Sequence, residues 1–509
     1  MKSTRIPTLA ILVAALLLVA GCAGGGTAPT SEGAGQNAAG GSLTWGWHLP
    51  STWDPVTSTV GQDVHVLSLA YAALTKQDVD GNAVPALAEE WEYNATGDEV
   101  TFRLRPNLTF TDGTPLDAEA VKHSLLRGRD APDSTIGAQL SVVTDIRVDS
   151  PTEVTLILNQ PDYQIPLLLS GKTGMIVSPT AVEQDPDGLA TRPVGAGPFA
   201  LDEYVPASHA TLHKNEDYWD ADSILVDDFE LRVPPDPTVA VAGIQSGQFD
   251  VAVIPPAQIE AARAAGLEVD IIDVFTVRVL DVNNTVEPFD DPRVTQAISH
   301  AIDRQELVDV AFFGEGDPNW QPFPRDYLAW NEELDELYAF DQDRARELLA
   351  QAGYPDGVAV TLTTQAENDP LAELLQQQLQ EVGIDVTLQV ATPGANNYVT
   401  RQYPFVVDSF SGRESPLQAL EVLFGPEGLM NLGRNAPPEI QEAIDVARST
   451  PLDDPGYEQA VEDAVAAAVT TMPNTFLFTW PRIFARDPSV QGFEHYIGTQ
   501  RFEGVTVGR

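Results

Sequence analysis

The chain contains a single cysteine, Cys22, in 509 residues, so no disulfide can form within it. A fold of this length must therefore be held together by packing alone. One hydrophobic core rarely serves so many residues, and we expect the folded part to divide into two or three subdomains. The hydrophobic content of 43% is ordinary for a globular protein and agrees with such a division.

The residues before Cys22 have the order of an export signal. Two cations, Lys2 and Arg5, precede an apolar segment over 6–20, and small residues follow it. The apolar segment is shorter than the roughly 20 residues that span a bilayer. We therefore predict that residues 1–21 are a signal peptide and that the mature protein works outside the cytoplasm.

The cysteine indicates how the protein is held at the cell surface. The ending Val19-Ala20-Gly21-Cys22 resembles the lipobox of bacterial lipoproteins, whose N-terminal cysteine is lipid-modified. This predicts lipidation at Cys22 and contact with the membrane through the lipid anchor. The alternative is a plain secretory signal with an incidental cysteine. Residues 22–41 are mostly Gly, Ala, Ser and Thr and predict a flexible tether.

The charge balance is strongly acidic, with 75 Asp and Glu against 28 Lys and Arg and a net charge of −47. Such a chain repels nucleic acid and anionic membrane surfaces, so neither is expected as a partner. Attraction of a cationic ligand is one interpretation. A solvated surface suited to a salty exterior is the other, and we favour it because the acidic residues are spread along the whole chain.

The chain contains stretches in which polar and apolar residues alternate, which is typical of half-buried strands. Between them lie amphipathic stretches, which are typical of helices. Asp117 is a predicted helix N-cap. Repeated helix–strand order predicts an α/β fold with sheets covered by helices. The predicted strands include 100–104, 154–158, 250–254 and 384–390, and the predicted helices include 117–126, 239–248, 343–352 and 371–382.

A series of short motifs runs over nearly the full mature length, among them PALAEEW, PVGAGPF and PFDDPRV. They lie at 53–55, 85–91, 101–115, 193–199, 215–219, 246–250, 288–294, 297–304, 348–357 and 383–384. In this order and spacing they resemble the extracytoplasmic solute-binding proteins of ABC importers, family 5, the dipeptide, oligopeptide and nickel-binding group.

The resemblance implies a two-lobe periplasmic-binding-protein-like fold of type II, with an extra inserted subdomain and closure of the lobes over a ligand. Few chain crossings should connect the lobes, near Arg192 and Val282. We expect lobe one over 42–74, 192–280 and 484–509, the inserted subdomain over 75–191, and lobe two over 281–483.

The resemblance also implies a monomeric receptor that captures a small-molecule solute, expected to be a peptide, and delivers it to ABC permease subunits. Such receptors have no catalytic cycle. The chain contains neither H-E-x-x-H nor G-x-S-x-G, so we do not expect an enzyme. The alternatives are an oligosaccharide receptor of the same importer class, a sensor lipoprotein without a permease, and a secreted hydrolase.

No cofactor and no metal site is predicted. The segment before Ala83 imitates a calcium loop, but Ala83 occupies the sixth position, which requires glycine, and a hairpin turn at 80–81 is the better interpretation. His209 and His213 lie on a predicted strand about 14 Å apart. That separation is too large for both to ligate one ion directly.

Ligand pockets combine aromatic side chains with a few aimed polar groups. We predict that the pocket includes Trp47, His48, Trp320, Phe410 and Trp480, with core packing as the alternative for the aromatic residues.

The loop 408–416 departs from the family pattern. Peptide binders commonly place there an Asp that pairs with the peptide's amine, but this chain has Arg413 near that position. Glu414 or Asp408 could pair with an amine instead. If Arg413 faces the pocket, it suits a carboxylate or a sugar hydroxyl.

Overall fold

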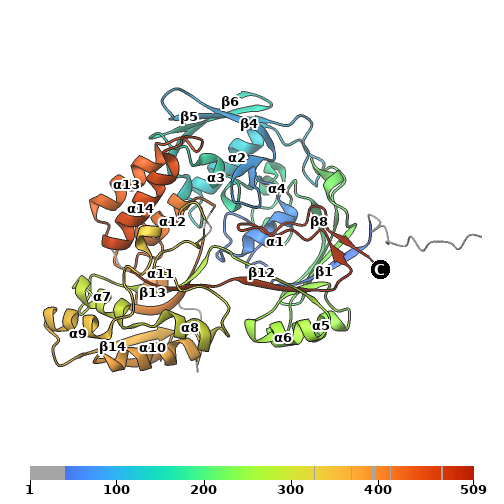
Figure 1. The fold of residues 1–509 in the computed structure, drawn as a ribbon. Helices are drawn as coiled ribbons and strands as arrows, with labels where there is room; N and C mark the ends of the chain where they lie inside the picture. Colours follow the sequence, from blue (N-terminus) through green and yellow to red (C-terminus); the bar gives the residue numbers. More distant parts are fainter. Residues whose placement is uncertain are drawn as a thin grey trace, which may run out of the picture. The chain divides into compact units, whose positions relative to one another are not determined.

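The computed structural model describes residues 40–508, except for 326, 368, 393–396, 413 and 472–473. The predicted signal peptide, Cys22 and nearly all of the predicted tether lie outside this part, and so does Arg413. The described residues belong to one unit of the chain, 37–509. They form a mixed α/β fold with three larger sheets (Figure 1), which confirms the predicted fold class.

The first strand, β1 (Ser42–Gly46), lies in the middle of a seven-stranded sheet. It pairs in parallel with β10 (Asp228–Arg232) on one side and with β11 (Val251–Val253) on the other. The helices α5 (Ala240–Gln245) and α6 (Ile259–Ala264) cover one face near β11 (Figure 1). The strand order is β12-β18-β11-β1-β10-β9-β8, with β12 (Glu268–Ile272), β18 (Arg482–Arg486), β9 (His209–Lys214) and β8 (Phe199–Val205).

A five-stranded sheet has helices on both faces. Successive side chains of its strand β13 (Thr276–Val282) point to opposite faces, so Val277 and Val279 join one hydrophobic cluster and Leu280 and Val282 another. The strand order is β15-β14-β16-β13-β17, with β15 (Ile384–Val390), β14 (Val358–Thr364), β16 (Phe405–Ser411) and β17 (Thr475–Thr479). The first cluster contains α12 (Pro416–Phe424), α13 (Pro438–Arg448) and α14 (Tyr457–Thr471), and the second contains α7 (Pro292–Ala301), α8 (Arg304–Ala311), α9 (Gln342–Gln351) and α10 (Pro370–Glu381).

A four-stranded antiparallel sheet packs against the helix α2 (Ala118–Asp130). The side chain of Asp117 accepts hydrogen bonds from the backbone N–H groups of Glu119 and Ala120, both at 3.1 Å. This confirms the predicted N-cap. The strand order is β4-β5-β7-β6, with β4 (Ala88–Tyr93), β5 (Glu99–Leu104), β7 (Glu153–Leu158) and β6 (Val143–Ser150).

The chain passes between the seven-stranded and the five-stranded sheets twice. It leaves through 273–275, between β12 and β13, and returns through 480–481, between β17 and β18. The expected lobe boundaries, after Leu280 and after Ile483, fall inside β13 and β18, because a strand pattern does not tell which sheet the strand joins. The division into lobes and an inserted subdomain stays a prediction.

Short elements complete the structure. The hairpin predicted at 80–81 is confirmed, since it joins the antiparallel strands β2 and β3. The bounds of these elements are α1 (Asp63–Ala70), β2 (Thr75–Gln77), β3 (Ala83–Pro85), α3 (Ile165–Leu168), α4 (Pro179–Gln184), α11 (Asn397–Thr400), β19 (Val490–Gln491) and β20 (Thr506–Val507).

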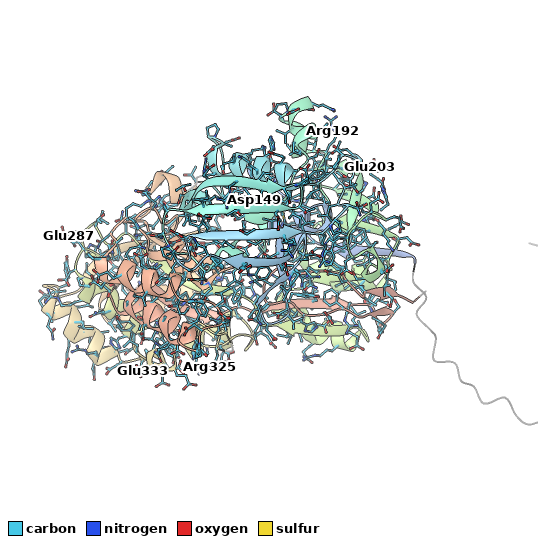
Figure 2. The ribbon with its side chains drawn as sticks, turned by 90° about the horizontal axis from the view of Figure 1, so that it is seen from above. Asp149, Arg192, Glu203, Glu287, Arg325 and Glu333 are labelled. Carbon is cyan, nitrogen blue, oxygen red and sulfur yellow. The ribbon has the colours of Figure 1, made fainter. Side chains whose placement is uncertain are left out.

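Charged side chains are distributed over the outside of the folded part. Figure 2 shows the acidic residues Asp149, Glu203, Glu287 and Glu333 on separate segments of the chain, with Arg192 and Arg325 among them. All six are exposed. This dispersed arrangement agrees with a solvated acidic surface.

Candidate functional site

A pocket lies where the seven-stranded and five-stranded sheets meet. The first crossing contributes 274–276, the end of β16 contributes Ser411 with the following Gly412 and Glu414, and the start of β18 contributes Arg482. The helix α1, the strand β2 and the segment 497–499 complete its lining. The cavity has a volume of about 50 Å³. Both sheets therefore supply walls to a single pocket.

Gln77 links the two sides of this pocket. Its side-chain Nε2 donates hydrogen bonds to the carbonyl oxygen of Glu414 at 3.0 Å and to that of Gly81 at 2.9 Å. Next to this contact, Ser415 Oγ donates to Gln164 Oε1 at 2.8 Å. The loop after β16 is thus held against residues that come much earlier in the chain.

His65 and Arg482 form a polar cluster in the pocket wall. Nη2 of Arg482 lies 2.8 Å from Nε2 of His65, and the backbone N–H of Gln500 donates to Nδ1 of His65 at 3.0 Å. Burial lowers the pKa of His65 well below its usual value, and the positive charge of Arg482 lowers it further. The imidazole is therefore neutral at neutral pH.

His48 and Asp63 lie beside this cluster. His48 Nε2 is 3.3 Å from Asp63 Oδ1, while Ser51 and Ser58 donate hydroxyl hydrogen bonds to Asp63 Oδ2 at 2.6 and 2.8 Å. Burial on its own raises the pKa of Asp63, but these hydrogen bonds outweigh it and lower the pKa below its usual value. Asp63 is thus an ionised carboxylate, and its partners are residues of the chain itself.

Trp47 lies beneath the same cluster. Its ring stacks on Trp45 with 5.1 Å between centroids and meets His65 edge-on at 6.1 Å. The guanidinium carbon of Arg482 lies 5.9 Å from the Trp47 ring centroid, within range of a cation–π contact. Only 7% of Trp47 is exposed. The structure therefore places Trp47 and His48 close to the pocket residues His65 and Arg482.

The other predicted aromatic residues lie in different surroundings. Trp480 follows β17 at the return crossing, where its backbone N–H donates to the carbonyl of Thr276 at 2.8 Å and its ring covers the guanidinium of Arg278 at 4.4 Å. Trp320 donates through Nε1 to the carbonyl of Tyr338 at 3.2 Å. Phe410 is fully buried in the cluster with α12–α14. Their roles in ligand binding stay predictions.

The side chain of Glu414 extends toward Gly171, a residue outside the lining of this pocket. A Cβ atom added to Gly171 would lie 2.0 Å from Oε1 of Glu414, so the carboxylate rests against the backbone of Gly171. No hydrogen bond or ion pair reaches this carboxylate from any residue that the structure describes. The neighbouring Arg413 lies outside the described residues, and its predicted contact with the ligand stays a prediction.

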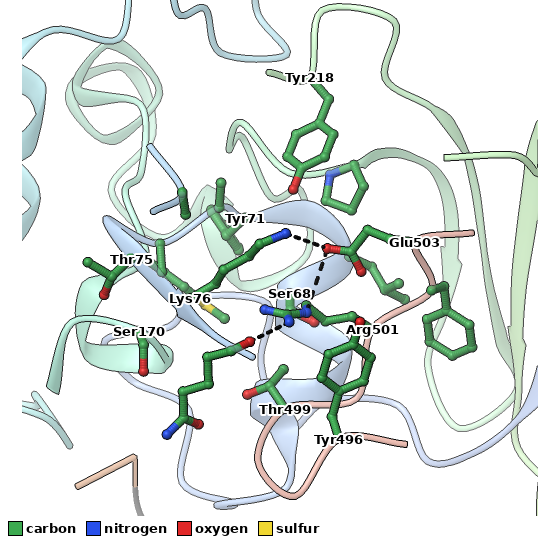
Figure 3. Close-up of a pocket in the computed structure, with 18 of the residues that line it drawn as sticks. Ser68, Tyr71, Thr75, Lys76, Ser170, Tyr218, Tyr496, Thr499, Arg501 and Glu503 are labelled. Atoms are coloured by element: carbon green, nitrogen blue, oxygen red, sulfur yellow. Dashed lines mark hydrogen bonds and ion pairs between the residues drawn. The ribbon is translucent and has the colours of Figure 1, made fainter. Parts of the chain in front are cut away.

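Figure 3 shows a second cavity, of about 60 Å³. It adjoins the first, since Gln77 and Thr499 line both. Its charged residues are Lys76, Asp78, Arg501 and Glu503, and Glu503 pairs with both cations. Lys76 Nζ lies 3.2 Å from Glu503 Oε1, and Arg501 Nε lies 3.6 Å from the same oxygen. Lys76 also lies over the Trp219 ring at 5.3 Å. This cavity therefore presents a neutralised set of charges.

Metal ligands do not gather in the part of the chain that the structure describes, where no group of three or more His, Cys, Asp or Glu is suited to hold an ion. His209 and His213 both lie on β9 and contact Glu203 and Asp202 respectively, at 3.6 and 2.8 Å. Among the described helices, none combines the length and apolar character that crossing a bilayer requires.

The family model of the bacterial extracellular solute-binding proteins, family 5, matches residues 82–428. The chain belongs to this family. The match covers both the four-stranded sheet and most of the five-stranded one, and it confirms the family that the motifs indicate. Family 5 consists of solute-binding proteins rather than enzymes.

Several named binding proteins are similar to this member of family 5. The glutathione-binding protein GsiB of Salmonella paratyphi A is 29% identical over 351 residues, 68% of each chain. The binding protein DppA of Helicobacter pylori, in complex with the peptide STSA, has a TM-score of 0.84 at 22% identity and covers 93% of this chain and 99% of its own. AgaA of A. tumefaciens R10, in complex with agropinic acid, has a TM-score of 0.81 at 25% identity and covers 92% and 99%.

Sequence reasoning in this family member missed most of the pocket lining, including the polar residues His65, Gln77 and Arg482. Arg482 and His65 are separated by 417 positions, so no local pattern connects them. One signal was present in the sequence, since Arg482 opens the apolar strand β18, where an arginine needs a partner or a function.

Proposed function

We propose that the protein is a lipid-anchored extracellular receptor that captures a peptide between its two lobes, as a monomer, and delivers it to an ABC permease. The observation that carries this proposal is the pocket whose walls come from both sheets at the two chain crossings. Few short crossings between two halves are what hinge closure around a ligand requires. The similarity to a glutathione-binding protein and to a peptide complex supports a peptide as the solute.

Glu414 is our candidate partner for the amine of the peptide. Glu414 is one of the residues that line the pocket, and its carboxylate has no ionic partner among the described residues. An ammonium group placed there would form a charge-assisted hydrogen bond. The position of Glu414, directly after the residue where peptide binders of the family commonly carry an acid, supports this assignment.

The volume of the pocket requires a movement before a peptide enters. A cavity of about 50 Å³ holds a few water molecules, since each needs roughly 10–15 Å³. The proposed movement is a rotation about 273–275 and 480–481 that breaks the hydrogen bond from Gln77 to Glu414. Closure after binding would then restore this contact.

Calorimetric titration of the soluble form from Ser42 with glutathione, tetrapeptides and oligosaccharides tests the peptide assignment. We expect heat of binding with peptides alone. The Glu414→Gln variant should bind a free-amine peptide at least about tenfold more weakly than the native protein, because one charge-assisted contact is lost. An N-acetylated peptide should bind both proteins alike. Binding of oligosaccharides alone would overturn the proposal.

The anchor and the permease are tested in cells. The native protein should fractionate with membranes and incorporate labelled fatty acid, whereas the Cys22→Ala variant should do neither. Peptide uptake should require the gene for this protein together with a permease. Membrane association that survives Cys22→Ala would contradict a lipid anchor at this residue.

A further inference from the structure

Arg482 is a shielded cation without an anionic partner. Its Nη1 atom is inaccessible to solvent and has no hydrogen-bond partner, although part of the residue lines the pocket. Within the described chain, its one polar side-chain contact is the approach of Nη2 to Nε2 of His65, and no carboxylate forms an ion pair with it. Burial lowers its pKa to about 10. An unpaired charge that is shielded from water lowers the free energy of unfolding. Its presence in a pocket wall therefore indicates a function.

Arg304 is a buried arginine with a structural role, and its hydrogen bonds can be compared with those of Arg482. Its Nε donates to the carbonyl of Phe476 at 2.8 Å, its Nη1 to the carbonyl of Ser299 at 3.0 Å, and its Nη2 to Ser299 Oγ at 2.8 Å. Every nitrogen of that guanidinium has an acceptor. Arg482 differs because Nη1 has none and Nη2 faces a histidine.

The contact between Arg482 and His65 lacks an acceptor as well. A neutral imidazole has one N–H and one bare nitrogen, and the N–H of Gln500 donates to Nδ1. We assign the ring proton to Nε2 on this ground, which places it toward the donor Nη2 of Arg482, 2.8 Å away. Two donors therefore face each other at the pocket wall, an arrangement that an oxygen acceptor beside both of them would complete.

We infer that Arg482 and His65 form the anchor for a carboxylate of the solute. The inference rests on the proposed function and specifies its substrate class as peptides with a free carboxylate. The guanidinium would donate from its Nη atoms and His65 from Nε2, while Trp47 supports the guanidinium from below. Glu414, the candidate partner of the amine, belongs to the same pocket lining, so the lining includes one residue of each sign, as a zwitterion requires.

The test compares two mixtures of tetrapeptides without Asp and Glu, one with free-acid and the other with amidated C-termini. The immobilised soluble form from Ser42 is exposed to each mixture, and retained peptides are quantified by mass spectrometry. The native protein should retain the free-acid mixture at least about tenfold better, because a charge-assisted hydrogen bond is lost on amidation.

Three variants separate the anchor from a general effect. Arg482→Met should remove the preference for the free acid while leaving the amidated peptides unaffected. Arg482→Lys should keep a reduced preference, since it keeps the charge without the planar fork. Arg147→Met, an exposed residue on β6, makes the same change in net charge and should leave the preference intact.

Each outcome decides a different claim. Equal retention of both mixtures by the native protein would overturn the carboxylate anchor and leave the peptide receptor standing. Retention of neither mixture would overturn the peptide receptor, and the anchor with it. A preference that persists in Arg482→Met, in protein with native near-ultraviolet circular dichroism, would place the carboxylate at another group.

Discussion

The carboxylate of Asp162 lies 3.5 Å from Nε of Arg448, at a boundary between the four-stranded sheet and the helices of the five-stranded sheet. Asp162 follows β7, and Arg448 is the last residue of α13. The backbone reinforces the contact, since the N–H of Tyr163 donates to the carbonyl of Arg448 at 3.0 Å. Burial raises the pKa of Asp162 to about 7, although Arg448 opposes this shift.

The raised pKa of Asp162 makes the stability of this boundary depend on pH. Because the folded state holds the proton more tightly than the unfolded state, this contribution is complete below pH 3.8 and is lost as the pH rises to about 7. Asp162→Asn should therefore match the native protein near pH 4 and become the more stable of the two near pH 8, by up to about 4 kcal/mol. Urea denaturation at both pH values measures the difference.

Asp149→Asn is the control with the opposite sign. Hydrogen bonds from Thr155 and Arg147 lower the pKa of Asp149 below its usual value, so this variant should lose stability relative to the native protein at pH 8 and recover it in acid. A constant difference between Asp162→Asn and the native protein over the whole range would contradict the assigned pKa.

Arg304→Met and Arg482→Met should affect stability differently. Arg304 is 3% exposed and satisfies several backbone carbonyls, so its removal should lower the free energy of unfolding by about 3–5 kcal/mol. Arg482→Met should not lower it, because an unpaired cation is removed and no acceptor is orphaned. Chemical denaturation without ligand checks both, and a large loss with Arg482→Met would show that the cation has an unrecognised structural partner.

Gly197 lies so close to the end of α1 that a side chain has no room there. A Cβ atom would be 2.4 Å from the carbonyl carbon of Ala70 and 2.5 Å from the nitrogen of Tyr71. Gly197→Ala should therefore cost about 3 kcal/mol or more, because backbone must shift. At Gly113 the added Cβ meets nothing within 4 Å, but φ is +78°, so Gly113→Ala should cost only about 1–2 kcal/mol. Thermal unfolding of both variants checks the order, and an equal loss would contradict the close approach.

Salt should stabilise the folded protein. A net charge of −47 produces self-repulsion over distances that shorten as the Debye length falls from about 10 Å at 0.1 M to about 3 Å at 1 M salt. We expect the melting temperature to rise with NaCl over this range. Sucrose of the same osmolality is the control, because it is excluded from the protein surface but does not screen charge. A melting temperature that NaCl leaves unchanged would contradict a role of charge repulsion.

Local features of the fold were predictable because they depend on neighbouring residues. The strand expected at 384–390 is β15 itself, and the helix expected at 371–382 is α10 shifted by one residue. The start of α9 was expected at Asp343, but Asp341 caps it through its hydrogen bond with the N–H of Arg344 at 2.9 Å. Two acids so close together compete for the same cap, and the sequence alone does not choose between them.

The site was less predictable because its residues come from distant segments. On β16, Phe410 faces the apolar cluster while Ser409 faces the other way and accepts a hydrogen bond from Arg278 at 2.6 Å. Alternation predicts that these two residues point apart, but it does not say which face meets the ligand. The contact of Arg482 with His65 likewise could not be predicted, because it forms only when β18 brings the two residues together in the folded structure.

The residues 276–479 leave and re-enter the rest of the fold through neighbouring strands. β13 and β17 pair with each other in one sheet, and β12 and β18 pair in the other. Two splice points, at 273–275 and 480–481, would therefore exchange this whole half between relatives without dividing a pair of strands. Glu414 and Arg482, the proposed partners of the amine and the carboxylate, lie on opposite sides of these splice points. Recombination could therefore supply them from different parents, and the two proposed contacts would then be selected as separate modules.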